Sequence, residues 1–231
     1  MPEVKAHISK RGLRTPRAAA IAGILFAVLM VTSFIMIQLS IPADSTDSSD
    51  WLEEEVGNIS IALSLLPFAG IAFLWFMGVV RDRIGLLEDQ FFSTLFFGSG
   101  LLYLAMSFAS AAIAGGILAV YVFDPDALFT SGIYSFSQGI IYKFSNVFAI
   151  RMAGMHMIVL GTIWVRTEVM PRWMALATFL LAVVLLVSIQ FLPWVTLVFP
   201  AWVFLISAYI LVLNYRYERQ DVKMDGMTVK N

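Results

Sequence analysis

The chain has 231 residues, of which 60% are hydrophobic and only 13% are charged, and its formal net charge is −1 at pH 7. Soluble domains carry roughly 45–50% apolar and about 25% charged residues, so this chain has too little polar surface to cover a soluble globule. A soluble enzyme is therefore excluded. The near-neutral charge offers no field that would attract nucleic acid. The absence of cysteine excludes disulfides, iron–sulfur clusters and thiolate metal sites.

Long uncharged runs along the chain predict membrane-spanning helices. A helix needs about 20 apolar residues, at about 1.5 Å each, to cross a hydrocarbon core of about 30 Å. The run at 173–215 is long enough for two such helices, so it must fold back. Residues 188–193 form the expected corner, with Pro193 in the first turn of the second helix. The helices expected in this way cover residues 18–40, 60–80, 94–118, 144–165, 172–189 and 193–214.

The distribution of basic residues predicts how these six helices are threaded. If the N-terminus is cytoplasmic, every Lys and Arg except Lys143 and Arg151 falls in a cytoplasmic segment, in agreement with the positive-inside rule. The sequence therefore predicts an all-α bundle of six transmembrane helices in the cell membrane, with both termini in the cytoplasm. Its expected parts are a basic cytoplasmic arm (1–17), a transmembrane domain (18–215) and a cytoplasmic polar tail (216–231).

Acidic residues are absent from all six predicted helices. Proton-coupled carriers usually need a titratable carboxylate at membrane depth, and intramembrane hydrolases need paired carboxylates or His/Glu ligand sets. All lysines lie in loops or at the ends, which excludes a retinal Schiff base. A bis-histidine haem is excluded because His7 and His156 are the only histidines. No enzyme activity, cofactor, metal site or nucleic-acid partner is expected.

Arg151 is the one charged residue inside a predicted helix, about 10 Å below its outer end. Two interpretations stay open. In the first, the long side chain reaches the outer surface and pairs with Asp124 or Asp126. In the second, it faces a cavity in the bundle and binds an anionic or carbonyl group, because a charge at this depth costs at least about 2.5–3.5 kcal/mol.

His156 lies near the middle of the same helix, about 140° around it from Arg151, so these two side chains do not form one site. We expect His156 to be neutral and hydrogen-bonded to a neighbouring helix, with a ligand-binding or pH-sensing role as the alternative. Asn146 and Thr162 are further polar residues of this helix. Together with Arg151 and His156 they are the candidate contacts for a small ligand or ion.

Prolines and small residues give further local signals. Pro67 and Pro200 each free a backbone carbonyl within a predicted helix, and such interruptions in two helices can line a binding site. In the helix at 94–118, Gly115 and Gly116 each follow an alanine by four residues. This spacing predicts the close approach of a neighbouring helix.

Three stretches at predicted helix ends and turns carry a resemblance to known sequences. They are residues 73–92, which include FLWFMGVVRDRIG and EDQFF, residues 149–153 (AIRMA) and residues 166–173 (RTEVMPRW). These stretches resemble an uncharacterised family of bacterial integral membrane proteins with six helices. The resemblance implies the same six-helix fold, and it carries no assigned activity with it.

Two functions from different classes fit these features. In the first, the protein is a small carrier or channel-like protein with a polar site on the fourth predicted helix. In the second, it is a non-catalytic membrane subunit or scaffold that binds a protein partner or lipid. The first is preferred because Arg151 needs an explanation. The few polar groups at mid-membrane depth favour an apolar or amphipathic ligand, or no ligand.

Overall fold

The computed structural model describes residues 2–40, 50–84, 90–168, 170–187 and 193–228, and this part of the chain contains helices and no strands. The helices follow one another as α1 (Pro2–Ser40), α2 (Asp50–Ile84), α3 (Gln90–Phe123), α4 (Pro125–Thr130), α5 (Ile133–Lys143), the π-helix η1 (Phe144–Ala149), α6 (Ile150–Thr167), α7 (Arg172–Val187), the 3₁₀-helix η2 (Pro193–Leu197) and α8 (Val198–Thr228). The all-α class predicted from the sequence is confirmed for these residues.

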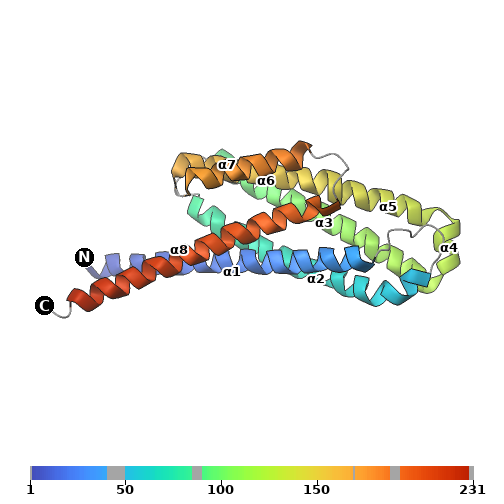
Figure 1. The fold of residues 1–231 in the computed structure, drawn as a ribbon, viewed down its shortest axis with the longest axis horizontal. Helices are drawn as coiled ribbons and strands as arrows, with labels where there is room; N and C mark the ends of the chain where they lie inside the picture. The colour runs from blue at the N-terminus through green and yellow to red at the C-terminus, as the bar shows by residue number, and fades with distance from the viewer. Residues whose placement is uncertain (1, 41–49, 85–89, 169, 188–192, 229–231) are drawn as a thin grey trace.

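The long helices form an elongated bundle (Figure 1). Helix α1 packs against α2 and α8, α6 packs against α7, and α3 connects the two groups through its contacts with α2 and α6. The start of α1 and the end of α8 lie at the same end of the bundle, while α4 and α5 lie at the opposite end (Figure 1). We call these the terminal end and the α4 end.

Five helices in the described part of the chain are long and apolar enough to cross a membrane: Arg17–Ser40, Glu55–Arg81, Gln90–Phe123, Ile133–Thr167 and Trp194–Tyr215. Helix α7 is apolar but has only 16 residues, about 24 Å of helix, which is shorter than a hydrocarbon core of about 30 Å. The five long helices are consistent with a membrane protein. The sixth crossing expected from the sequence depends on α7.

Several helices are longer than the spans expected from hydropathy. Helices α5, η1 and α6 form one continuous helix over residues 133–167, where the sequence predicted residues 144–165. Helices α1 and α8 likewise continue through the basic arm and the polar tail. The difference has a simple cause, because hydropathy marks the part of a helix that suits lipid and not the points at which its backbone hydrogen bonds stop. The predicted corner at 188–192 lies outside the described residues, and η2 begins at Pro193.

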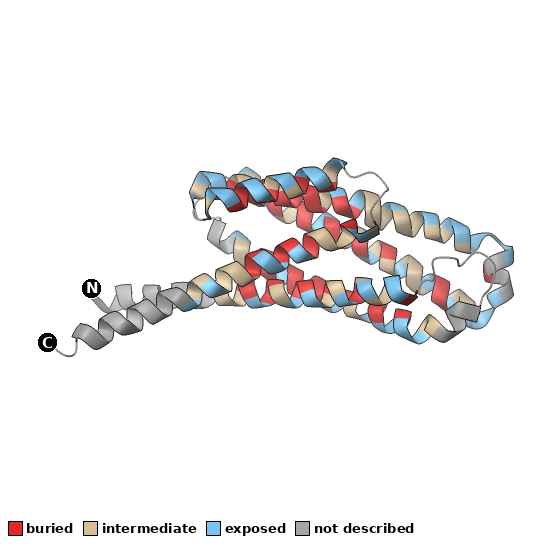
Figure 2. Ribbon diagram, viewed as in Figure 1, coloured by how far each residue is buried: buried red, intermediate tan, exposed pale blue. Residues whose placement is uncertain are grey.

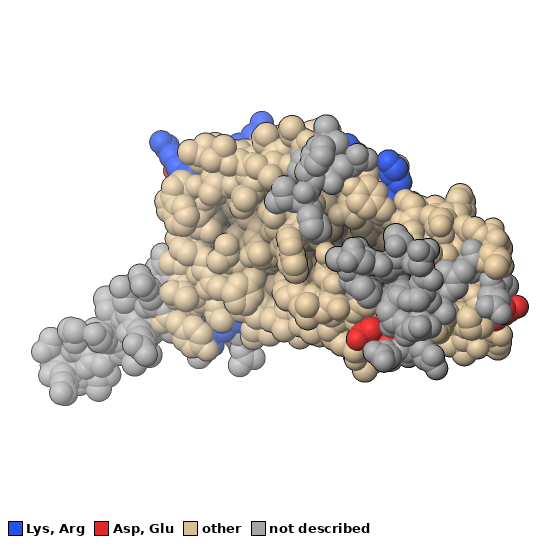
Figure 3. Space-filling model, turned by 45° about the vertical axis from the view of Figure 1, so that its right-hand side comes forward, with Lys and Arg blue, Asp and Glu red and all other residues tan. Residues whose placement is uncertain are grey.

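The buried residues run along the middle of the bundle (Figure 2). Its largest fully buried side chains include Phe26, Phe73, Phe96 and Phe199. The outward faces are also apolar, as shown by α7, where Trp173 is 65% exposed and Leu180 is 62% exposed. A broad part of the face in Figure 3 carries no charged side chain. Such a surface is unfavourable in water and indicates a lipid environment.

Arginines at the terminal end pack over aromatic rings, an arrangement that suits the headgroup level of a bilayer. Each guanidinium carbon lies within contact distance of a ring centroid. The distances are 5.1 Å for Arg17 over Tyr215, 5.1 Å for Arg81 over Phe97 and 4.5 Å for Arg166 over Phe92.

Close helix approaches occur at other glycines than the sequence suggested. A Cβ added at Gly23 in α1 would collide with Ser207 in α8, and one added at Gly100 in α3 would collide with Met77 in α2. A Cβ added at Gly115 or Gly116 would meet no atom within 4 Å, so the close approach predicted there is wrong. The small side chains in this part of α3 leave open space beside the helix, and no described neighbouring helix fills that space.

Candidate functional site

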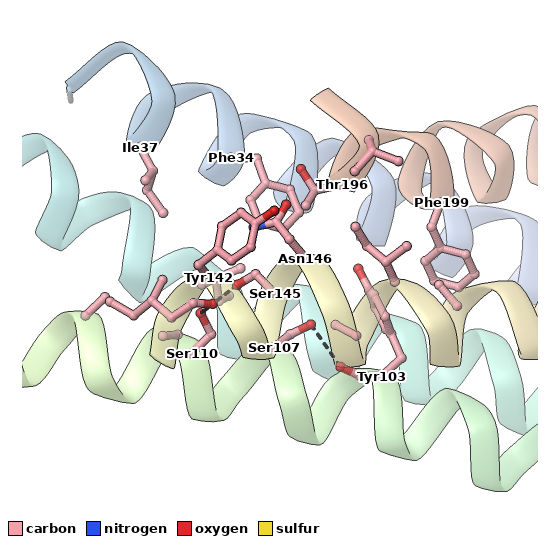
Figure 4. A pocket seen from close by; sticks show the side chains of 18 of the residues that line it. Phe34, Ile37, Tyr103, Ser107, Ser110, Tyr142, Ser145, Asn146, Thr196 and Phe199 are labelled. Carbon is pink, nitrogen blue, oxygen red and sulfur yellow. Dashed lines mark hydrogen bonds between the residues drawn. The ribbon is translucent and has the colours of Figure 1, made fainter. Parts of the chain in front are cut away.

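A cavity of about 240 Å³ lies between α1, α3, η1 and the start of α8 (Figure 4). It occupies the part of the bundle nearer the α4 end, where α7 ends and α8 begins, and Leu185 of α7 belongs to its wall. None of its lining residues is charged. The polar residues in its wall are Gln38, Tyr103, Ser107, Ser110, Gln138, Tyr142, Ser145, Asn146 and Thr196.

Three irregular stretches of helix surround this cavity. The π-helix η1 supplies Ser145 and Asn146 to the wall, and the 3₁₀-helix η2 supplies Thr196. Pro200 follows η2 and has no N–H to donate to the carbonyl of Thr196. Pro67 interrupts α2 four residues after Leu63, another wall residue. Interrupted helices at a polar cavity are a recurring feature of transporters, and π-helical turns often occur at functional sites.

Hydrogen bonds within the wall fix its serine hydroxyl groups. Ser110 Oγ lies 2.6 Å from Ser145 Oγ, which connects α3 to η1. Ser107 donates its hydroxyl to the backbone carbonyl of Tyr103 at 2.9 Å. The phenolic oxygen of Tyr103 is buried and has no hydrogen-bonding partner among the described residues. Figure 4 shows the Tyr103 side chain reaching from α3 toward the cavity. Its hydroxyl is therefore a buried donor without an acceptor.

Aromatic rings close the cavity on the side of the terminal end. Tyr103 packs against Phe199 with a centroid separation of 4.6 Å and against Phe73 at 5.9 Å. Phe73 and Phe199 lie 5.6 Å apart, and Phe26 lies 4.6 Å from Phe73. These rings come from α1, α2, α3 and α8, and all four are buried. We call Phe26, Phe73, Tyr103 and Phe199 the aromatic floor.

His156 lies beside the aromatic floor and does not line the cavity. The side chain is fully buried, and its Nδ1 donates a hydrogen bond to the backbone carbonyl of Phe96 in α3 at 3.0 Å. This is the hydrogen bond to a neighbouring helix that the sequence led us to expect. Because a carbonyl only accepts, Nδ1 carries a proton in this hydrogen bond. Its Nε2 has no hydrogen-bonding partner among the described residues.

The other candidate residues lie in different environments. Arg151 is exposed on the outside of α6, does not line the cavity and forms no ion pair with Asp124 among the described residues. The side chain of Asp126 lies outside the described residues. Thr162 donates to the carbonyl of Ile158 in its own helix at 2.8 Å. Of the four candidate contacts, only Asn146 lines the cavity.

Several wall residues were not singled out from the sequence. Tyr103 and Tyr142 look like ordinary membrane aromatics, and Thr196 lies in the first turn of the last predicted helix. The proline positions were the available signal, since Pro67 and Pro200 both lie next to wall residues. No residue type in the sequence signals the π-helix in the way that the prolines signal the interruptions of α2 and α8.

The apolar helices define the class of this molecule as a helical protein consistent with a membrane location. No group of three or more His, Cys, Asp or Glu residues in the described ranges is placed to hold a metal ion. Comparison of the chain with known protein families, curated proteins and solved structures finds no match. The resemblance to six-helix bacterial membrane proteins therefore stays an expectation.

Proposed function

We propose that this protein is a small carrier of the cell membrane, with six crossings and both termini in the cytoplasm, that binds a small ligand in the cavity. The supporting observation is the concentration of polar side chains in one place of an otherwise apolar bundle. Polar groups within a membrane are costly and usually serve packing or a ligand. The Tyr103 hydroxyl makes no hydrogen bond in the described part of the chain that would explain it as a packing group.

The aromatic floor favours a carrier over an open channel. A ligand that enters from the α4 end meets the rings of Tyr103 and Phe199, which pack against each other and against Phe73. Passage therefore requires a movement of the floor, which is the property that separates an alternating carrier from a pore. The irregular turns at η1 and η2 provide backbone that can change register without breaking a regular helix.

The charge distribution supports the proposed orientation. Arg17, Arg81 and Arg166 lie at the terminal end, and the positive-inside rule places that end in the cytoplasm. The cavity then faces the outside. Helix α7 begins at Arg172 near the same end and runs toward the start of η2. A helix of about 24 Å can cross where the bilayer thins locally, so six crossings are compatible with its length.

A second candidate function rests on Arg151. An exposed arginine on the outer surface of α6, near the exposed Phe148, is costly in lipid unless its side chain snorkels or pairs with an anionic group. A membrane subunit with a partner at this face would supply such a group. The cavity favours the carrier, because it offers polar groups within the chain itself.

Solute uptake into proteoliposomes tests the carrier. We expect the purified protein to accelerate the entry of a member of a panel of small uncharged solutes, read by light scattering after mixing. Ala111 lines the cavity and Ala112 is exposed next to it, so Ala111→Leu should abolish the acceleration and Ala112→Leu should leave it unchanged. Two results would contradict the proposal. Either the unmodified protein gives the same uptake rate as empty liposomes, or Ala112→Leu abolishes the acceleration as Ala111→Leu does.

A further inference from the structure

The cavity places a strict limit on the charge of its ligand. Its wall contains no Asp, Glu, Lys, Arg or His. A charged ligand would lose its hydration on entry and would find no counter-charge in surroundings of low dielectric constant, which is strongly unfavourable. Arg151 and Lys143 are both exposed and outside the wall. The ligand that suits this cavity is therefore uncharged.

One polar group in the wall lacks a partner that a ligand could supply. The Tyr103 hydroxyl is buried, with the residue only 4% exposed, and it makes no hydrogen bond among the described residues. Ser107 donates its hydroxyl to the backbone carbonyl of Tyr103, the hydroxyls of Ser110 and Ser145 bond to each other, and none of the three makes a hydrogen bond with the phenolic oxygen of Tyr103. A buried donor without an acceptor is costly, and a ligand with an acceptor oxygen removes that cost. Tyr103 is the donor best placed to recognise such an oxygen.

The shape and size of the cavity restrict the remainder of the ligand. Aromatic rings of Phe34, Tyr103, Tyr142 and Phe199 contribute to its wall (Figure 4), and such surfaces favour a flat apolar body. A dry cavity of about 150 Å³ already admits benzene. The cavity here measures about 240 Å³, which suits one ring with a polar substituent.

From these three observations we infer that the cavity binds a small uncharged molecule with a flat apolar body and a carbonyl-type acceptor oxygen, which the Tyr103 hydroxyl recognises. This inference rests on the proposed function and names its class of ligand. Aromatic ketones and amides are the simplest molecules with this chemistry. The apolar body contacts the rings of the wall, and the oxygen lies at the buried phenol.

Three fluorinated probes test this inference on the full-length protein in lipid nanodiscs: para-fluoroacetophenone, para-fluorobenzoate and para-fluoroethylbenzene. Binding is measured as the broadening of the probe signal in fluorine NMR. Nanodiscs that contain Ala111→Leu provide the correction for probe dissolved in lipid. We expect the ketone to bind to the unmodified protein at least about fivefold more tightly than the hydrocarbon. The benzoate should show no binding.

Tyr103→Phe identifies the donor, because it removes the hydroxyl and keeps the ring. The variant should weaken ketone binding about fivefold and leave hydrocarbon binding unchanged. Tyr209→Phe, outside the cavity wall, should alter neither. Equal weakening of both probes by Tyr103→Phe would overturn the role of the hydroxyl.

The outcomes separate this inference from the proposed function. Benzoate binding as tight as ketone binding would overturn the uncharged class and leave the cavity as the binding site. If all three probes behave alike in the unmodified protein and in Ala111→Leu, the cavity binds none of them, and the inference fails. The uptake measurement with the same variant then decides separately whether the carrier proposal fails with it.

Discussion

In the proposed site, Tyr103 serves ligand binding at the expense of stability. Its ring packs within the aromatic floor, while its hydroxyl is buried without a partner. Because an unsatisfied buried hydroxyl costs about 1–3 kcal/mol, Tyr103→Phe should raise the free energy of unfolding by about 1 kcal/mol. Thermal unfolding in detergent measures this change, with Tyr209→Phe as the control. A loss of stability of similar size would show that the hydroxyl has a partner in the folded protein.

Arg151 differs from Tyr103 because its polar group is charged and lies on an exposed face of α6. A side chain that snorkels to the bilayer surface contributes little to folding, whereas breaking a buried ion pair costs about 3–5 kcal/mol. Since Arg151 is exposed, Arg151→Leu should change the free energy of unfolding by less than about 1 kcal/mol. The thermal unfolding of this variant is compared with that of Arg151→Lys. A destabilisation of several kcal/mol would indicate a buried partner within the chain and would remove the reason for the subunit hypothesis.

At the level of helices, the packing of α1 against α8 depends on the absence of a side chain at Gly23. A methyl group there would collide with Ser207 and Phe76, and such overpacking costs about 1–3 kcal/mol. Gly116 in α3 has open space around it, and Gly→Ala in a helix stabilises by about 0.5–1 kcal/mol. Gly23→Ala and Gly116→Ala should therefore shift the unfolding temperature in opposite directions. A shift in the same direction for both would contradict the packing described here.

Element positions were predictable from the sequence because lipid exposure imposes long apolar runs. The five long helices and the apolar α7 all coincide with runs identified by hydropathy. The contacts between helices were less predictable, since the spacing of Gly115 and Gly116 is the same whether a helix packs there or leaves a space. The π-helix was not predictable either. Its Ser145 bonds to Ser110 across the bundle, and neither residue encodes that contact locally.

The candidate site was predictable only in part, for a related reason. Position along a helix follows from the sequence, but the direction of a side chain depends on how that helix is rotated against its neighbours. Arg151 and Asn146 lie five residues apart, yet one is exposed and the other lines the cavity. The intervening π-helical turn also alters the angular relation that a regular helix would give. Reasoning with a uniform 100° per residue fails across such a turn.

For the whole molecule, the decisive question is whether α7 crosses the bilayer. The start of α1 and the end of α8 lie at the same end of the bundle (Figure 1), an arrangement that needs an even number of crossings. The five long helices alone give an odd number. In the proposed topology of six crossings, helix α7 returns the chain to the side where η2 begins, despite its 16 residues.

The cysteine-free chain allows a direct measurement of this topology. Single cysteines are introduced as Ser9→Cys, Ser135→Cys and Thr228→Cys, and intact cells are treated with a membrane-impermeant maleimide. Because Ser135 is exposed in α5 at the α4 end, Ser135→Cys should react in intact cells. The other two should react only after permeabilisation, since the basic terminal end is expected in the cytoplasm. Reaction of only one terminal cysteine in intact cells would show an odd number of crossings, and α7 would then lie within one side of the bilayer.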